Sequence, residues 1–279
     1  MSRTTNPMDA PTSRRQALRL GGVTLGLGAI VAACGDDRTG DESPGRVGYA
    51  PTPEPLGDYE VTDATLLRTV SSLELTAVHI YDEALGSGAL PADAEEIVEK
   101  LRDSHQEVAD RFGELTAAAG GDSWECTNPW MMDRTFEPIL AVIEESDDRA
   151  RDYLSLAATL ENLTAATNQT FTERLTETDQ VTATIESAAL ESRQSAVVAI
   201  SVGGSDAYLS PVLFDEEVVA VDGVIPQYAI TSQFGSVAQM ELAVGAPDEN
   251  GNRQSFIVQT PAENSYVYEE YGTTCVDEG

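Results

Sequence analysis

Basic residues are scarce in this chain of 279 amino acids. Its 16 lysine and arginine residues stand against 48 aspartate and glutamate residues, which gives a formal net charge of −32. A surface of this sign repels polyanions, so the composition excludes nucleic acid as a partner. The acidity fits a halophilic or marine source, and it fits an ordinary exported protein equally well.

Catalytic motifs are equally scarce. The chain has two histidines and no Gly-x-Ser-x-Gly sequence, so the serine-hydrolase arrangement is excluded. Its three cysteines do not have the spacing of a zinc site. We therefore predict no catalytic residue, and the sequence leaves open whether the protein is an enzyme.

No apolar run is long enough to cross a membrane. The longest run starts at Leu20, ends just before Cys34 and has about 14 residues, whereas a spanning helix needs roughly 20. Arg14 and Arg15 precede it, and an arginine pair before a mildly apolar stretch is the pattern of twin-arginine export signals. Residues 1–33 are therefore predicted to be a signal peptide that directs the chain out of the cytoplasm.

The apolar run ends at Val31-Ala32-Ala33-Cys34. This ending resembles the bacterial lipobox, in which small residues precede a cysteine that is lipidated and becomes the new N-terminus. The resemblance implies an extracytoplasmic protein that is anchored to the membrane through a lipid on Cys34, while its protein partners stay unknown. The alternative is an ordinary Ala-x-Ala cleavage site with an incidental cysteine.

The two remaining cysteines form an even pair. With Cys34 assigned to the lipid, Cys126 and Cys275 are left, and the environment outside the membrane permits disulfides. We therefore predict a disulfide between them.

The composition and the hydrophobic periodicity of the chain change twice after the predicted signal peptide. Residues 34–59 are rich in proline, glycine and acidic residues and lack hydrophobic periodicity, so we predict a disordered tether. Residues 60–215 have helical periodicity. Residues 216–279 are predicted to be a β-rich extension, with a hairpin that turns at Asp248-Glu249-Asn250-Gly251.

The helical region predicts a mainly α fold, a four-helix bundle with one long crossover. Glycines end the first two long helices, and Gly203-Gly204 is expected to stop the fourth. A short, a long and a short connection between four long helices are typical of this bundle. The long helices are expected at about 62–86, 92–120, 148–176 and 179–202, with a short helix at about 133–145.

Ionisable side chains interrupt the apolar stripes of the four long helices. Glu74, Glu161 and Glu191 lie on or beside three of the stripes, and His105 holds the comparable position on the second helix. Ile185 is expected to point inward on the fourth helix. Because an unpaired buried charge costs several kcal/mol, the four ionisable side chains are predicted to converge at one level of the bundle.

Together these residues resemble a ferritin-like domain, of the kind found in exported lipoproteins of high-GC Gram-positive bacteria. Glu74 with Tyr81 seven positions later matches the first-helix pattern of that family, and Glu161 matches the third-helix glutamate. Glu191-Ser192-Arg193-Gln194 falls where the family has Glu-x-x-His, with glutamine in place of histidine. His105-Gln106-Glu107-Val108 has histidine at the glutamate position and valine at the histidine position. The resemblance implies a degenerate carboxylate metal site made of Glu74, His105, Glu161, Glu191 and Gln194, with Tyr81 beside it.

Two functions are compatible with this set of side chains. Carboxylates and imidazole suit iron, manganese or zinc, so the first hypothesis is a cell-surface, ferritin-like lipoprotein that binds a divalent metal. The second is a non-catalytic envelope lipoprotein, in which a protonated His105 and Gln194 hydrogen-bond the glutamates and no metal is bound. Under both hypotheses Tyr81 packs in the core and makes a hydrogen bond.

Overall fold

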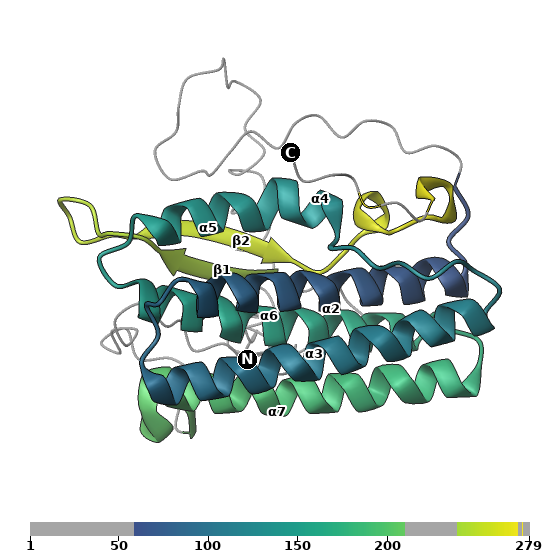
Figure 1. The fold of residues 1–279 in the computed structure, drawn as a ribbon, viewed down its shortest axis with the longest axis horizontal. Coiled ribbons are helices and arrows are strands. Elements are labelled where there is room, and N and C mark those ends of the chain that lie inside the picture. The colour runs from purple at the N-terminus through teal and green to yellow at the C-terminus, as the bar shows by residue number, and fades with distance from the viewer. Residues whose placement is uncertain (1–58, 210–238, 273–274, 276–279) are drawn as a thin grey trace, which may run out of the picture. The chain divides into compact units, whose positions relative to one another are not determined.

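The computed structural model describes residues 59–209, 239–272 and 275. The predicted signal peptide, Cys34 and the tether up to residue 58 lie outside the described residues. Figure 1 shows long helices side by side, with a pair of strands next to them. The helices are α2 (Asp63–Gly86), α3 (Ala92–Ala118), α4 (Pro129–Met131), α5 (Glu137–Glu144), α6 (Arg149–Thr172) and α7 (Thr178–Leu209), and a π-helical turn η1 (Met132–Phe136) joins α4 to α5. The strands are β1 (Gln239–Val244) and β2 (Gln254–Gln259), and single 3-10 turns η2 (Glu263–Ser265) and η3 (Glu269–Tyr271) follow.

The long helices begin and end at residues with suitable local chemistry. The hydroxyl of Thr62 accepts a hydrogen bond from the backbone N–H of Thr65 at 3.2 Å and so caps the start of α2. The carboxylate of Asp148 caps α6 in the same way. Gly88 and Gly120 follow α2 and α3 with φ of 64° and 87°, a left-handed conformation that glycine adopts without steric cost.

Four helices form the bundle. Helix α2 packs along α3, α6 packs along α7, and the two pairs meet through α2 against α6 and α3 against α7. Residues 119–148 form the one long connection and contain α4, η1 and α5. The predicted bundle with one long crossover is therefore confirmed.

The hairpin of β1 and β2 covers part of the bundle. The strands are antiparallel, with Met240 opposite Val258 and Leu242 opposite Phe256. Alternate side chains are buried in one apolar cluster with α5 and α6, and Figure 1 shows the hairpin beside α5. The alternation of apolar residues thus predicted this element correctly, because one face of the strands packs on the helices.

The C-terminal tail packs back onto the bundle. Tyr266 and Tyr268 are buried among apolar side chains of α2, α3 and α6. The backbone N–H of Val267 donates to the hydroxyl of Thr69 at 2.9 Å. A disulfide joins Cys126 in the crossover to Cys275, with a Cα–Cα distance of 5.5 Å. The tail is therefore held both by packing and by a covalent link.

Two predictions for the fourth helix are wrong. Helix α7 runs through Gly203-Gly204 to Leu209, because a glycine inside a helix costs only about 1 kcal/mol and does not remove a hydrogen bond. Ile185 is 52% exposed. Thr184 takes the inward position instead, four residues before Ala188, and its hydroxyl hydrogen-bonds that of Thr172 at 3.0 Å.

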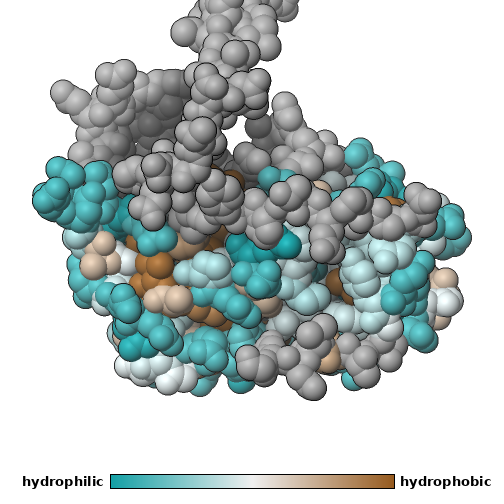
Figure 2. All heavy atoms as spheres, turned by 90° about the horizontal axis from the view of Figure 1, so that it is seen from above, coloured by the Kyte–Doolittle hydropathy of each residue, from teal (hydrophilic) through white to brown (hydrophobic). Residues whose placement is uncertain are grey.

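One face of the described part can be seen in a space-filling view. On the face seen in Figure 2, hydrophilic residues surround small apolar patches. Within the described residues, no helix combines the length and the apolar character that a membrane span requires.

Candidate metal centre

Each of the four long helices contributes one ionisable side chain to a buried cluster at the middle of the bundle. Glu74 comes from α2, His105 from α3, Glu161 from α6 and Glu191 from α7. Every one of them is at most 1% exposed. Apolar clusters lie on both sides along the bundle, one around Leu73 and Ala77 and the other around Val70 and Phe112. The four polar groups therefore meet in a dry environment, where electrostatic interactions are strong.

His105 is the centre of this cluster. Its Nδ1 lies 2.5 Å from Oε2 of Glu74, and its Nε2 lies 3.1 Å from Oε1 of Glu161. The same oxygen of Glu161 accepts a hydrogen bond of 2.6 Å from the hydroxyl of Tyr81. The imidazole thus bridges carboxylates from two different helices, and Tyr81 makes the hydrogen bond predicted for it.

Glu191 is held by an amide that the sequence motifs did not single out. The Nδ2 of Asn168 donates to both carboxylate oxygens of Glu191, each at 3.2 Å. Asn168 is fully buried on α6, and its Oδ1 has no hydrogen-bond partner within the part of the chain that the structure describes. It lies on the inward stripe of the third long helix, and this position was the one signal in the sequence. A neutral amide belongs to none of the ligand motifs, so the motifs pass over it.

The electrostatics of the cluster favour two extra protons. Burial lowers the pKa of His105, but the negative charges of Glu161 and Glu74 raise it by more, so it lies well above its ordinary value. Burial and the charge of Glu74 raise the pKa of Glu191 well above that of a free glutamate. In the metal-free cluster, these shifts favour the protonated forms of His105 and Glu191.

Tyr81 stays neutral in this environment. Burial and the adjacent charge of Glu161 raise the pKa of its hydroxyl well above the ordinary value. The phenol is therefore a hydrogen-bond donor to Glu161 over the whole physiological pH range.

The donor atoms fit a divalent cation. Glu74, His105 and Glu191 each offer one ligand atom, and these three atoms lie within 4.8 Å of one another. Oε2 of Glu161 and Oε1 of Glu74 are both buried and find no hydrogen-bond partner among the described residues. Buried oxygens that lack a partner are costly, and a cation would satisfy them. This buried group could therefore hold a metal ion.

Glu161 and Gln194 stand apart from this three-residue group. Glu161 belongs to the cluster because its Oε1 contacts Nε2 of His105, and the same oxygen also accepts the hydrogen bond from Tyr81. Gln194 is half-buried one turn after Glu191. Its side chain makes no hydrogen bond to the four ionisable residues in the described part of the chain.

Comparison of the chain with family models, with curated proteins and with solved structures finds no significant match. The functional argument therefore starts from the geometry of the buried cluster.

Proposed function

We propose that this protein is a ferritin-like lipoprotein that is exported by the twin-arginine route, anchored through a lipid on Cys34, and binds one divalent metal ion inside its helical bundle. The single observation that carries the metal function is the buried convergence of Glu74, His105 and Glu191, with ligand atoms within 4.8 Å. Carboxylate and imidazole are ligands that iron, manganese and zinc accept.

Each residue of the cluster has a distinct role in this proposal. Glu74, His105 and Glu191 hold the ion, which supplies positive charge to offset the buried carboxylates. Asn168 keeps both oxygens of Glu191 in place through its bonds of 3.2 Å. Tyr81 orients Glu161 by donating a hydrogen bond of 2.6 Å. Hydrogen-bonded partners of this kind typically change metal affinity by about 10–100-fold when removed.

The location outside the cytoplasm is supported by two separate features. The sequence has an arginine pair, a short apolar run and a cysteine at the spacing of a lipoprotein signal. The Cys126–Cys275 disulfide agrees with it, because disulfides persist in oxidising compartments.

A second candidate is a metal-free envelope protein in which the cluster only stabilises the bundle. The observation that favours it is that both nitrogens of His105 already contact carboxylates, at 2.5 and 3.1 Å. An imidazolium in this position neutralises part of the buried negative charge without any ion. Under this candidate the bundle serves as a structural or binding module.

Metal content separates the two candidates. The protein is purified without chelator and analysed for bound elements, and the metal-free form is titrated calorimetrically with manganese, zinc and, without oxygen, ferrous iron. We expect one ion per chain and loss of binding in Glu191→Gln. The matched control is Glu186→Gln on the same helix, whose carboxylate pairs with Arg111 at the surface.

A second variant, which adds a histidine to the cluster, makes the metal-binding experiment more decisive. Gln194→His returns an imidazole three residues after Glu191, as in the Glu-x-x-His pattern, and should tighten binding. If neither the natural chain nor this variant binds any of the three metals, the metal function is wrong and the structural candidate stands.

A further inference from the structure

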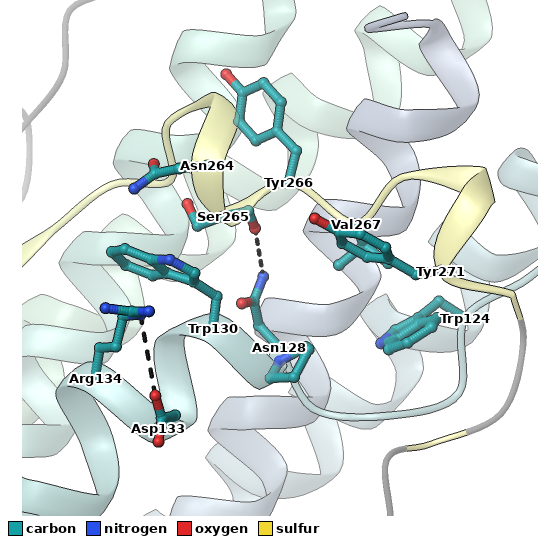
Figure 3. A pocket seen from close by; sticks show the side chains of 11 residues that line it. Trp124, Asn128, Trp130, Asp133, Arg134, Asn264, Ser265, Tyr266, Val267 and Tyr271 are labelled. Carbon is teal, nitrogen blue, oxygen red and sulfur yellow. Dashed lines mark hydrogen bonds and ion pairs between the residues drawn. The ribbon is translucent and has the colours of Figure 1, made fainter. Parts of the chain in front are cut away.

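A pocket of about 380 Å³ lies between the crossover and the C-terminal tail, away from the buried metal cluster. Its volume falls in the range of roughly 300–1,000 Å³ that is usual for small-molecule sites. In the view of Figure 3, Trp130 and Trp124 stand at opposite ends, with Asn128 between them. Its lining includes Trp124, Asn128, Trp130, Asp133, Arg134 and Asn264.

The aromatic walls are held rigidly. The indole Nε1 of Trp124 donates to the carbonyl of Thr127 at 3.2 Å, and the guanidinium of Arg68 lies 5.3 Å from its ring centroid. Trp130 is half-buried, and the guanidinium carbon of Arg134 lies 5.2 Å from the centroid of its ring. Tyr271 is 41% exposed. Trp124 is only 3% exposed and forms the floor of the pocket, so the aromatic surfaces that a ligand can reach are those of Trp130 and Tyr271.

Two polar side chains at the Trp130 end, those of Asp133 and Asn264, have unused hydrogen-bonding capacity. The side chain of Asp133 is 74% exposed and has only a weak ion pair of 4.0 Å with Arg134. The half-buried amide of Asn264 makes no hydrogen bond with the described residues. Asn128, in contrast, uses both N–H groups inside the protein and serves the fold.

The charges around the pocket exclude most ionic ligands. Each indole already has a guanidinium within 5.3 Å, so a second cation on either ring would meet a like charge. An anion would meet Asp133 and the strongly negative chain as a whole. An uncharged, polar ligand is therefore favoured.

We propose that this pocket binds an uncharged saccharide. A sugar ring has an apolar C–H face that stacks on an indole or phenol, and its edge carries hydroxyl groups. Those hydroxyls would donate to the carboxylate of Asp133 and accept from Arg134 and Asn264. Aromatic faces next to a few convergent polar groups fit this combination. The inference does not depend on the metal function.

The two tryptophans of the chain both line the pocket. Intrinsic tryptophan emission of the full-length protein therefore reports on this pocket alone. We would titrate the protein with maltotriose and with N,N′,N″-triacetylchitotriose, to distinguish a plain glucan from an N-acetylated glycan, and repeat each titration by calorimetry. A saturable response to either sugar is expected.

The variants assign the response to the pocket. Trp130→Ala should weaken binding on the order of tenfold, because it removes a stacking surface. Trp130→Phe should retain most of the affinity. Asn264→Ala removes only an amide without protein partners, so it should weaken binding while the fold is preserved. Ile257→Ala on β2, an exposed apolar residue outside the pocket, is the control that should leave binding unchanged.

Several outcomes would overturn the proposal. One is the lack of a saturable signal with both sugars in both methods. A second is equal affinity in Trp130→Ala, Asn264→Ala and the natural chain. A third is that tetramethylammonium or a proline-rich decapeptide saturates the pocket while the sugars do not, because that result would assign it to a different class of ligand.

Discussion

The Glu191→Gln variant separates two effects of this buried carboxyl group: the free-energy cost of ionising it inside the protein, and its contribution to metal binding. Burial and the charge of Glu74 raise the pKa of Glu191, so at a pH between the unfolded and the folded pKa the native metal-free protein holds a proton that the unfolded chain releases. Its contribution to stability is thus fully present below the unfolded pKa and is lost as pH rises toward the folded pKa. Each unit of difference in pKa corresponds to about 1.4 kcal/mol.

Glutamine does not titrate, so the variant escapes this loss. It gives up one of the two hydrogen bonds from Asn168, which costs about 1 kcal/mol. We therefore expect Glu191→Gln without metal to be at most about 1 kcal/mol less stable than the natural chain near pH 4.5. As pH rises, the difference in the free energy of unfolding should move in favour of the variant.

With metal the order reverses. An ion at 100 times its dissociation constant stabilises the native state by about 2.7 kcal/mol, which raises Tm by about 5–11 °C for a domain of this size. If the loss of the carboxylate weakens binding about 100-fold, the same ion concentration gives the variant only about 0.4 kcal/mol and 1–2 °C.

The assay is thermal unfolding of both proteins between pH 4.5 and 9, with manganese and with a chelator, and Glu186→Gln as the control. The reasoning fails if Glu191→Gln keeps the full metal-dependent rise in Tm. It also fails if the metal-free variant loses stability relative to the natural chain as pH increases, since burial of Glu191 would then carry no proton cost.

Three further predictions follow from other parts of the molecule. Burial lowers the pKa of His105, but the charges of Glu161 and Glu74 raise it by more. The contribution of His105 to stability is therefore fully present below about pH 6.5, the unfolded pKa, and is lost as pH rises through the folded pKa. His105→Gln should make the free energy of unfolding in urea depend less on pH above about 6.5. Cys275→Ser opens a loop that spans 149 residues, and it should lower the free energy of unfolding by up to about 4–5 kcal/mol in chemical denaturation; an unchanged value would show that packing alone holds the tail. Replacing Arg14 and Arg15 by lysine should block export, and Cys34→Ala should move the protein from the membrane fraction to the soluble fraction; retention of Cys34→Ala in the membrane after a salt wash would refute the lipid anchor.

Most of the fold could be predicted from the sequence, because it depends on local periodicity. Apolar residues at helical spacing define the bundle helices, and glycines such as Gly88 and Gly120 adopt the left-handed conformation that ends them. The alternation around Leu242 and Phe256 defines the hairpin. These signals depend on residues that are close together in the chain, so they can be recognised without knowledge of the tertiary structure.

At the fourth helix, local sequence patterns gave two wrong predictions. Hydrophobicity favoured Ile185 as the inward residue, but the register of α7 against α6 buries Thr184, whose hydroxyl is satisfied by Thr172. Gly203-Gly204 has the composition of a helix stop, yet α7 continues through it. In both places a weak local preference is overridden by the geometry of the whole helix.

The sequence by itself determined that Glu74, His105, Glu161 and Glu191 point inward, because four polar positions on apolar stripes need one another. Only the tertiary structure decided how they pair: that His105 bridges Glu74 and Glu161, and that Asn168 holds Glu191. The pairing depends on the rotation and height of four separate helices, which no local pattern encodes. The aromatic pocket is a stronger case, because its walls come from residues 124–134 and 264–271, and packing of the tail onto the crossover brings them together.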